Sequence, residues 1–161
     1  MGWNTFKKTY KASWETFESG EDAATLIVDQ YHIAIMTALG SQGAAVGGKY
    51  ISGNKAGLLN MLKPAFNATI NGQQTIFKIG QQLQMGLMMY WVPGTVLSNT
   101  AVIASPGATP VWVDYPSNPG RPDIDTFLDD LVMAFDTHLL GVTGAIPSVP
   151  PVPFVGYKVL A

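Results

Sequence analysis

The two histidines of this 161-residue chain are the side chains best suited to proton transfer or metal binding. His32 follows Asp29 by three residues, which would allow a hydrogen bond on the polar side of a helix. His138 follows Asp136 near the end of an expected helix, where a cation would suit the negative end of the dipole. Neither histidine has a metal-binding spacing such as H-E-x-x-H. A two-histidine site between subunits stays open.

Residues 43–50, GAAVGGKY, match the G-x-x-x-x-G-K part of a phosphate-binding loop. A working loop follows a buried strand and opens a helix, and a Ser or Thr after the lysine holds Mg²⁺. Here the segment follows an expected helix, and Tyr50 occupies the position of that Ser or Thr. We therefore interpret it as an adaptable surface loop in a glycine-rich break and not as a nucleotide site.

Other catalytic patterns are missing from the sequence. There is no cysteine and no G-x-S-x-G motif, which excludes a cysteine nucleophile and the usual hydrolase elbow. Asp129 and Asp130 are adjacent, so on a helix they point to different sides and form no dyad. We expect no enzyme, no cofactor and no metal site. The enzymatic alternative is a hydrolase with an unrecognised carboxylate site, which would require a deep cleft lined by Asp or Glu.

The composition favours a surface that other subunits cover. Only 12% of the residues are charged, against roughly 25% in an average protein. The net charge of −2 argues against a nucleic-acid partner. No apolar run approaches the roughly 20 residues of a membrane span, and the first 17 residues lack the apolar segment of a signal peptide.

The few charges are unevenly distributed. Between residues 30 and 113 there is no acid, and the bases there are Lys49, Lys55, Lys63 and Lys78. Residues 123–136 contain five aspartates and no base, and residues 79–113 contain no charge at all. One interpretation is that the basic middle and the acidic late segment are complementary surfaces of neighbouring subunits. The alternative is a chance distribution over solvated faces.

Apolar residues recur at steps of three and four in five segments, which is the period of an amphipathic helix. The sequence therefore predicts a mainly α-helical, bundle-like domain of about five helices, near residues 3–17, 20–39, 58–70, 76–91 and 123–140. Pro64 should kink or restart the third helix, and Gly80 and Gly86 should let another helix approach the fourth closely. Residues 95–120 predict an irregular or hairpin insertion.

The two ends of the chain provide the candidate contact residues. The first helix has an aromatic face that either packs on the core or docks on another chain. The chain divides into a domain at 1–145 and a proline-rich arm at 146–161, whose prolines impose an extended path. This apolar arm needs a groove on its own domain or on a neighbour. The candidate protein–protein contacts are Trp3, Phe6, Pro150, Pro151, Pro153, Phe154 and Tyr157.

The order of these segments resembles small virion structural proteins of large tailed bacteriophages. The resemblance is carried by DQYHIAIMTAL, a glycine-rich break, LKPAF, YWVPGTV, FLDDLVMAFDTHL and the proline-rich tail. It implies a structural protein of the tail, baseplate or neck, assembled in the bacterial host cytoplasm into the virion. Its partners would be like subunits in a homo-oligomer and other virion proteins. The alternative is a decoration or host-attachment module, for which Trp112 and Tyr115 are the candidate binding residues.

Overall fold

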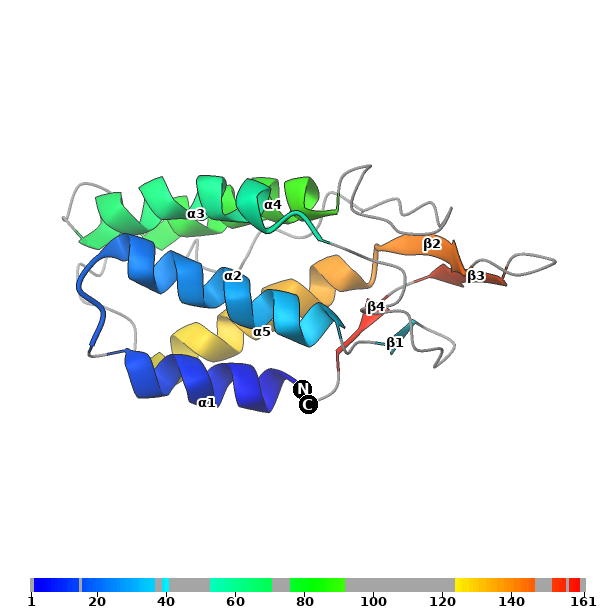
Figure 1. Cartoon of the computed structure of the whole chain (residues 1–161), viewed down its shortest axis with the longest axis horizontal. Helices are drawn as coiled ribbons and strands as arrows, with labels where there is room; N and C mark the ends of the chain where they lie inside the picture. The colour runs from blue at the N-terminus through cyan, green and yellow to red at the C-terminus, as the bar shows by residue number, and fades with distance from the viewer. Residues whose placement is uncertain are drawn as a thin grey trace.

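The computed structural model describes residues 2–14, 16–36, 39–40, 53–70, 76–91, 124–146, 152–155 and 157–159. These residues form five helices and four short strands (Figure 1). In chain order they are α1 Trp3–Ser13, α2 Gly20–Met36, β1 Leu39–Gly40, α3 Lys55–Ile70, α4 Ile76–Tyr90, α5 Ile124–Leu139, β2 Thr143–Ile146, β3 Val152–Val155 and β4 Tyr157–Lys158. The prediction of a mainly α, bundle-like domain with five helices is confirmed. The expected insertion at 95–120 and the loop at 43–50 lie outside the described residues.

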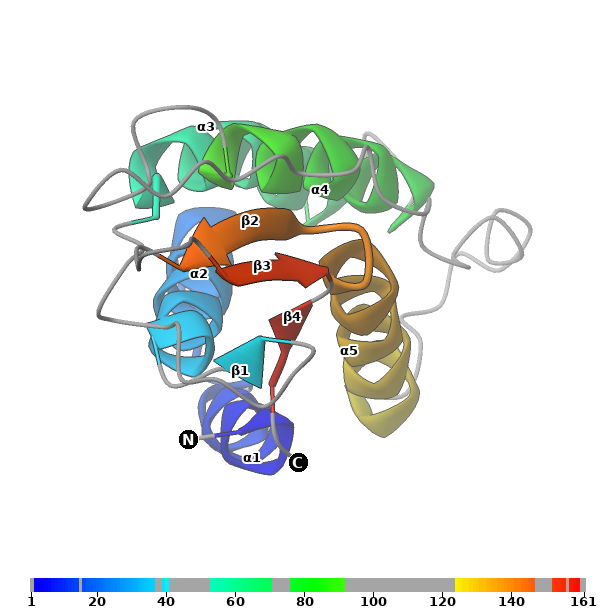
Figure 2. The ribbon, with the colours of Figure 1, turned by 90° about the vertical axis from the view of Figure 1, so that its right-hand side faces the viewer.

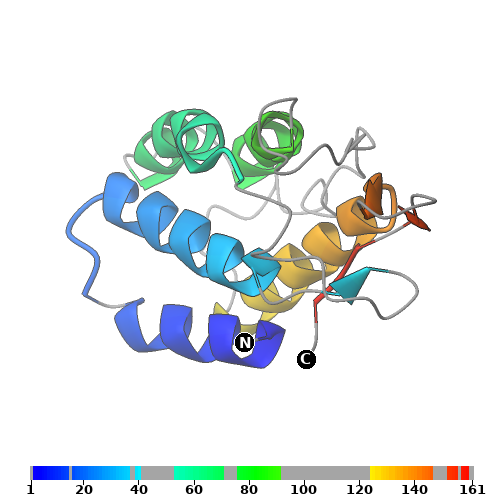
Figure 3. The same ribbon diagram turned by 45° about the vertical axis from the view of Figure 1, so that its right-hand side comes forward.

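The helices pack in three layers. α3 and α4 lie side by side in one layer, next to the layer that holds α2 and α5, and α3 packs on α2 (Figure 2). α1 lies on the opposite side and contacts both α2 and α5 (Figures 1 and 3). The short strands gather at one end of the helices. The apolar stripes of all five helices therefore face one shared core.

Local sequence explains where several helices begin. The side chain of Asn54 accepts a hydrogen bond of 3.0 Å from the amide of Gly57, so Asn54 caps α3. The hydroxyl of Ser19 accepts a weaker one, 3.3 Å long, from the amide of Asp22 at the start of α2. α3 continues through Pro64 from Lys55 to Ile70, so the expected restart at this proline does not occur.

α1 is shorter than the aromatic pattern predicts, because the helix ends at Ser13. The next aromatic residues still reach the core: the rings of Trp14 and Phe17 lie 5.9 and 5.3 Å from Tyr10. Trp14 also lies 6.0 Å from Phe127 of α5. The aromatic face thus continues past the helix end, and it packs inward along its whole length.

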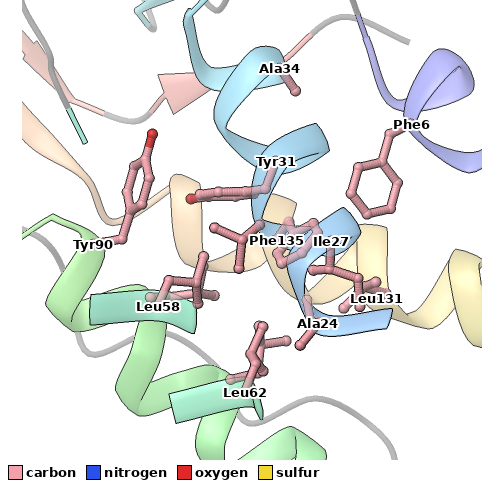
Figure 4. Close-up of a cluster of buried hydrophobic side chains, with 14 of the residues drawn as sticks. Phe6, Ala24, Ile27, Tyr31, Ala34, Leu58, Leu62, Tyr90, Leu131 and Phe135 are labelled. Carbon is pink, nitrogen blue, oxygen red and sulfur yellow. The ribbon is translucent and has the colours of Figure 1, made fainter. Parts of the chain in front are cut away.

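The centre of the core is a cluster of aromatic rings from three helices. Phe135 lies 5.4 Å from Trp3, 5.7 Å from Phe6 and 4.7 Å from Tyr31, measured between ring centroids. Figure 4 shows Phe6, Tyr31 and Phe135 pointing toward one another, with Leu58 and Leu62 of α3 next to them. Edge-to-face and offset ring pairs of this kind stabilise a core beyond the area that they bury.

Two glycines set the spacing of α3 against its neighbours. A Cβ atom at Gly86 would lie 2.7 Å from Cδ1 of Leu58 and 3.2 Å from Cβ of Met61, so the predicted close approach of a helix to Gly86 is confirmed. At Gly20 a Cβ atom would lie 2.5 Å from the backbone nitrogen of Asn67. α3 is therefore held close to both α4 and α2.

The described part of the C-terminal arm is extended and pairs with residues of its own chain. β3 is antiparallel to β2, with the register Thr143–Val155 to Ile146–Val152, so the pairing crosses the expected boundary at residue 145. β4 is antiparallel to β1 and pairs Lys158 with Leu39. Val159, directly after β4, is 5% exposed. The sequence left open whether the arm packs on its own domain or on a neighbour. The described arm residues pack on their own chain.

Candidate functional site

α2 and α4 are joined by two hydrogen bonds between neighbouring aromatic and polar side chains. Nδ1 of His32 lies 2.7 Å from the hydroxyl of Tyr90. The second bond joins the residues next to this pair. Nε1 of Trp91, directly after α4, donates a 3.0 Å hydrogen bond to the hydroxyl of Tyr31. The backbone amide of Asn54 also donates to the carbonyl of Tyr90, at 3.0 Å. These contacts tie the end of α4 to α2 and to the start of α3.

The surroundings of His32 favour the neutral form of its imidazole over the charged form. Burial lowers the pKa of His32, the cation of Lys55 lowers it further, and the carboxylate of Asp29 acts in the opposite direction. Asp29 forms an ion pair with Lys55 at 2.7 Å, and the partner of His32 is Tyr90, so the expected hydrogen bond from Asp29 to His32 is replaced by these two contacts. Because the Tyr90 side chain is 0% exposed, the pair connects helices and presents no phenol at the surface.

His138 is a core residue. Its side chain is 1% exposed, although it stands in the last turn of α5 where a charged imidazole would suit the helix dipole. Burial disfavours the charged form of a histidine, which acts against the favourable effect that the helix end would have on a cation. Within the described ranges, no three His, Cys, Asp or Glu side chains are grouped so that they could hold a metal ion.

Several charges that one interpretation of the sequence assigned to neighbouring subunits form ion pairs within this chain. Two aspartates of α5 bind lysines of α1, and two lysines of α3 bind acids of α2. The pairs are Lys7–Asp129 at 3.0 Å, Lys11–Asp125 at 2.8 Å, Lys55–Asp29 at 2.7 Å and Lys63–Glu21 at 2.9 Å. Two aspartates of the acidic late helix are therefore paired with α1, which lies beside it.

From Gln81 onward, the outer side of α4 is exposed and uncharged. Lys78, three residues before Gln81, belongs to the same helix, but its side chain lies outside the described residues. Gln81, Met85 and Met88 are exposed at steps of four and three, with Met85 51% and Met88 43% exposed. Half-buried neighbours widen this stripe, and no charged residue occurs from residue 79 to residue 91. We call this surface the α4 face; it consists of Gln81, Gln82, Gln84, Met85, Met88 and Met89.

Sequence reasoning noted the uncharged run but nominated none of the residues of the α4 face. The signal was available, because these positions lie opposite the periodic stripe of Ile79, Leu83, Leu87 and Tyr90, which is buried as predicted. Large apolar or neutral side chains on the side opposite such a stripe are those that a helix exposes.

The contact residues that the sequence analysis nominated do not lie on the α4 face. Trp3 and Phe6 are 4% and 1% exposed, and Nε1 of Trp3 donates a 2.7 Å hydrogen bond to Asp136. They are core residues in this fold, which corrects their assignment to a subunit interface, and the first helix packs inward. Pro153 and Phe154 lie on β3 and Tyr157 lies on β4. The other nominated residues, Pro150, Pro151, Trp112 and Tyr115, lie outside the described residues.

Comparisons with known proteins identify no relative. No protein-family model matches the chain, and neither a curated protein nor a solved structure is significantly similar to it. Among the helices of the described part, none is long and apolar enough to cross a membrane.

Proposed function

We propose that this protein is a structural subunit that associates with copies of itself, and that the α4 face is one of its contact surfaces. The observation that carries the proposal is the pair of exposed methionines, Met85 and Met88, in a stretch of α4 without charge, residues 79–90. Methionine is unbranched and polarisable, so it adapts to an irregular partner surface. Interface cores are likewise depleted of charged residues and enriched in methionine.

The energetics indicate that the α4 face does not act alone. Burying the exposed parts of Met85 and Met88 is worth on the order of 2 kcal/mol per subunit. Association costs roughly 4–15 kcal/mol in translational and rotational freedom. A stable assembly therefore needs further contacts on each subunit, or many subunits that share them.

The resemblance to virion proteins of large tailed bacteriophages supports a more specific proposal. In it, the subunit is built into the tail, baseplate or neck, with like subunits and other virion proteins as partners. The low charge of the chain, 12% of its residues, is compatible with a surface that neighbours cover. Mass spectrometry of purified particles tests this placement, since the protein would have to occur there in a fixed ratio to other virion proteins.

Self-association is tested by light scattering over a concentration series, with the wild type beside two matched variants. Met88→Lys places a charge on the α4 face, and Met133→Lys places the same charge at a 48% exposed position of α5. We expect a mass that rises with concentration for the wild type and Met133→Lys, and a lower mass for Met88→Lys. A wild type that stays monomeric throughout, or two variants that behave alike, would contradict the proposal.

A further inference from the structure

The β2–β3 hairpin is the part of the described structure that depends least on the helices. The two strands contact each other far more than either contacts any helix. Figure 1 shows the hairpin at the end of the molecule, beyond the ends of α3 and α4. Neither strand contains a charged residue, since their sequences are TGAI and VPFV. A two-stranded hairpin is at best marginally stable in water by itself, so additional pairing would stabilise it.

Pro153 determines which edge of the hairpin can accept another strand. Pro153 faces Ala145 in the ladder, and a proline has no N–H to donate. Because opposite pairs in an antiparallel ladder alternate between hydrogen-bonded and non-hydrogen-bonded, the bonded pairs must be Gly144–Phe154 and Ile146–Val152. The backbone groups of Thr143 and Ala145 therefore point away from β3, toward the outer edge of β2.

The two outer edges of the hairpin are not equivalent. The outer edge of β2 presents both N–H and C=O groups of Thr143 and Ala145, and among the described residues no strand pairs with it. The outer edge of β3 lacks a donor at Pro153, which is a usual way for a protein to block an edge strand. Among the described strands, the outer edge of β2 is thus unpaired and has both donors and acceptors, and the outer edge of β3 lacks one donor.

We propose that the outer edge of β2 pairs with β2 of a second copy of this chain, antiparallel about a two-fold axis. The inference rests on the proposed self-association and names one of the further contacts that it requires. An axis through Gly144 places Thr143 of each copy opposite Ala145 of the other copy. Each of these pairs exchanges N–H···O hydrogen bonds in both directions. The result is one four-stranded sheet in the order β3–β2–β2–β3.

A second copy fits this edge for two reasons. A closed antiparallel pair brings each residue at the axis against itself, and Gly144 has no side chain that would collide there. The strands also contain no charge, so identical chains meet without like-charge repulsion across the new ladder.

The test compares Ala145→Pro with Val155→Pro by light scattering of the full chain over a concentration series. Ala145→Pro removes the outward N–H on β2 of both copies, and Val155→Pro removes an outward N–H on β3 only. We expect Ala145→Pro to weaken association by roughly tenfold or more, and Val155→Pro to associate like the wild type. If Ala145→Pro associates like the wild type, or if both variants lose association equally, the pairing is wrong.

Amide hydrogen exchange of the wild type covers the case in which Ala145→Pro fails to fold. The amides of Thr143 and Ala145 should exchange more slowly as the protein concentration rises, and exchange that does not depend on concentration overturns the pairing. The proposed function fails separately. If Met88→Lys lowers the mass and Ala145→Pro does not, self-association stands without this strand contact. A wild type that is monomeric at every concentration refutes both.

Discussion

The outward faces of α4 and α5 differ, although the two helices have similar lengths and similar buried stripes. α5 carries Asp125, Asp129 and Asp136 on its exposed side, and each of them bonds to a side chain of α1. The exposed side of α4 has two methionines and one glutamine, Met85, Met88 and Gln81. Charge on α5 thus keeps that face solvated and tied to its neighbour, whereas residues 79–90 of α4 carry no charge that would oppose burial by another protein.

The difference between the two helices reflects an uneven distribution of the few charges over the surface. With 12% of residues charged, the chain has too few charges to cover every face. The described ion pairs join α1 to α5 and α2 to α3, and α4 takes part in none of them. The uncharged surface is therefore concentrated on particular elements.

The largest effect is expected for the inner face of α5. Phe135→Ala removes a fully buried ring that contacts Trp3, Phe6 and Tyr31. We expect a loss of roughly 3–5 kcal/mol in the free energy of unfolding, measured by urea titration followed by circular dichroism. A loss below about 1 kcal/mol would mean that the aromatic cluster is not the centre of the core.

The next effect concerns the packing of α3 against its two neighbours. Gly20→Ala brings a Cβ atom to 2.5 Å from a backbone atom of Asn67, which cannot move aside. At Gly86 the nearest atom is the flexible end of Leu58, and alanine also gains about 1 kcal/mol of helix propensity. We expect Gly20→Ala to cost roughly 1–3 kcal/mol and Gly86→Ala clearly less in thermal unfolding. The reverse order would contradict the helix spacing.

A pH-dependent effect is expected for the bond between α2 and α4. The pKa of His32 is lowered from 6.5 in the folded protein, mainly by burial. As the pH drops below about 6.5, His32 binds a proton in the unfolded chain but less readily in the folded protein. The free energy of unfolding therefore falls as the pH drops below that value. His32→Gln should remove this part of the pH dependence between pH 7 and 5. Equal slopes for both proteins in that range would refute the contribution of His32.

The smallest effect is expected for the charged face of α5. Asp125→Asn removes an exposed ion pair with Lys11, and we expect a loss of about 0.2–1 kcal/mol that shrinks with added salt. The measurement is urea unfolding at low and high ionic strength. A larger loss, or a change in mass by light scattering, would show that α5 contributes to assembly and would remove the contrast with α4.

The helices were predictable from the sequence because apolar periodicity reports burial directly. The stripes of α2, α4 and α5 appear in the core as the spacing indicates. The same periodicity cannot distinguish a face that packs on its own core from one that docks on another chain. Trp3 and Phe6 therefore had two interpretations, and their burial among Tyr31 and Phe135 decided between them.

Contacts between distant parts of the chain were not predictable. The hydroxyl partner of His32 is Tyr90, 58 positions away, and the local acid Asp29 pairs with Lys55 instead. The strand that holds the end of the arm, β1, has two residues and no alternating pattern to reveal it. The proline content did predict the extended path of the arm correctly, but not that Pro153 would lie within a ladder.

The contact role of the α4 face is tested most directly by methyl NMR of the wild type, with methionine methyl groups labelled and assigned. Spectra recorded over a concentration series compare Met85 and Met88 of α4 with Met133 of α5, all of which are exposed in the monomer. We expect the Met85 and Met88 signals to shift or broaden as the mass rises, while the Met133 signal stays unchanged. If the mass rises with no change at Met85 and Met88, or if Met133 changes alone, the α4 face is not the contact surface.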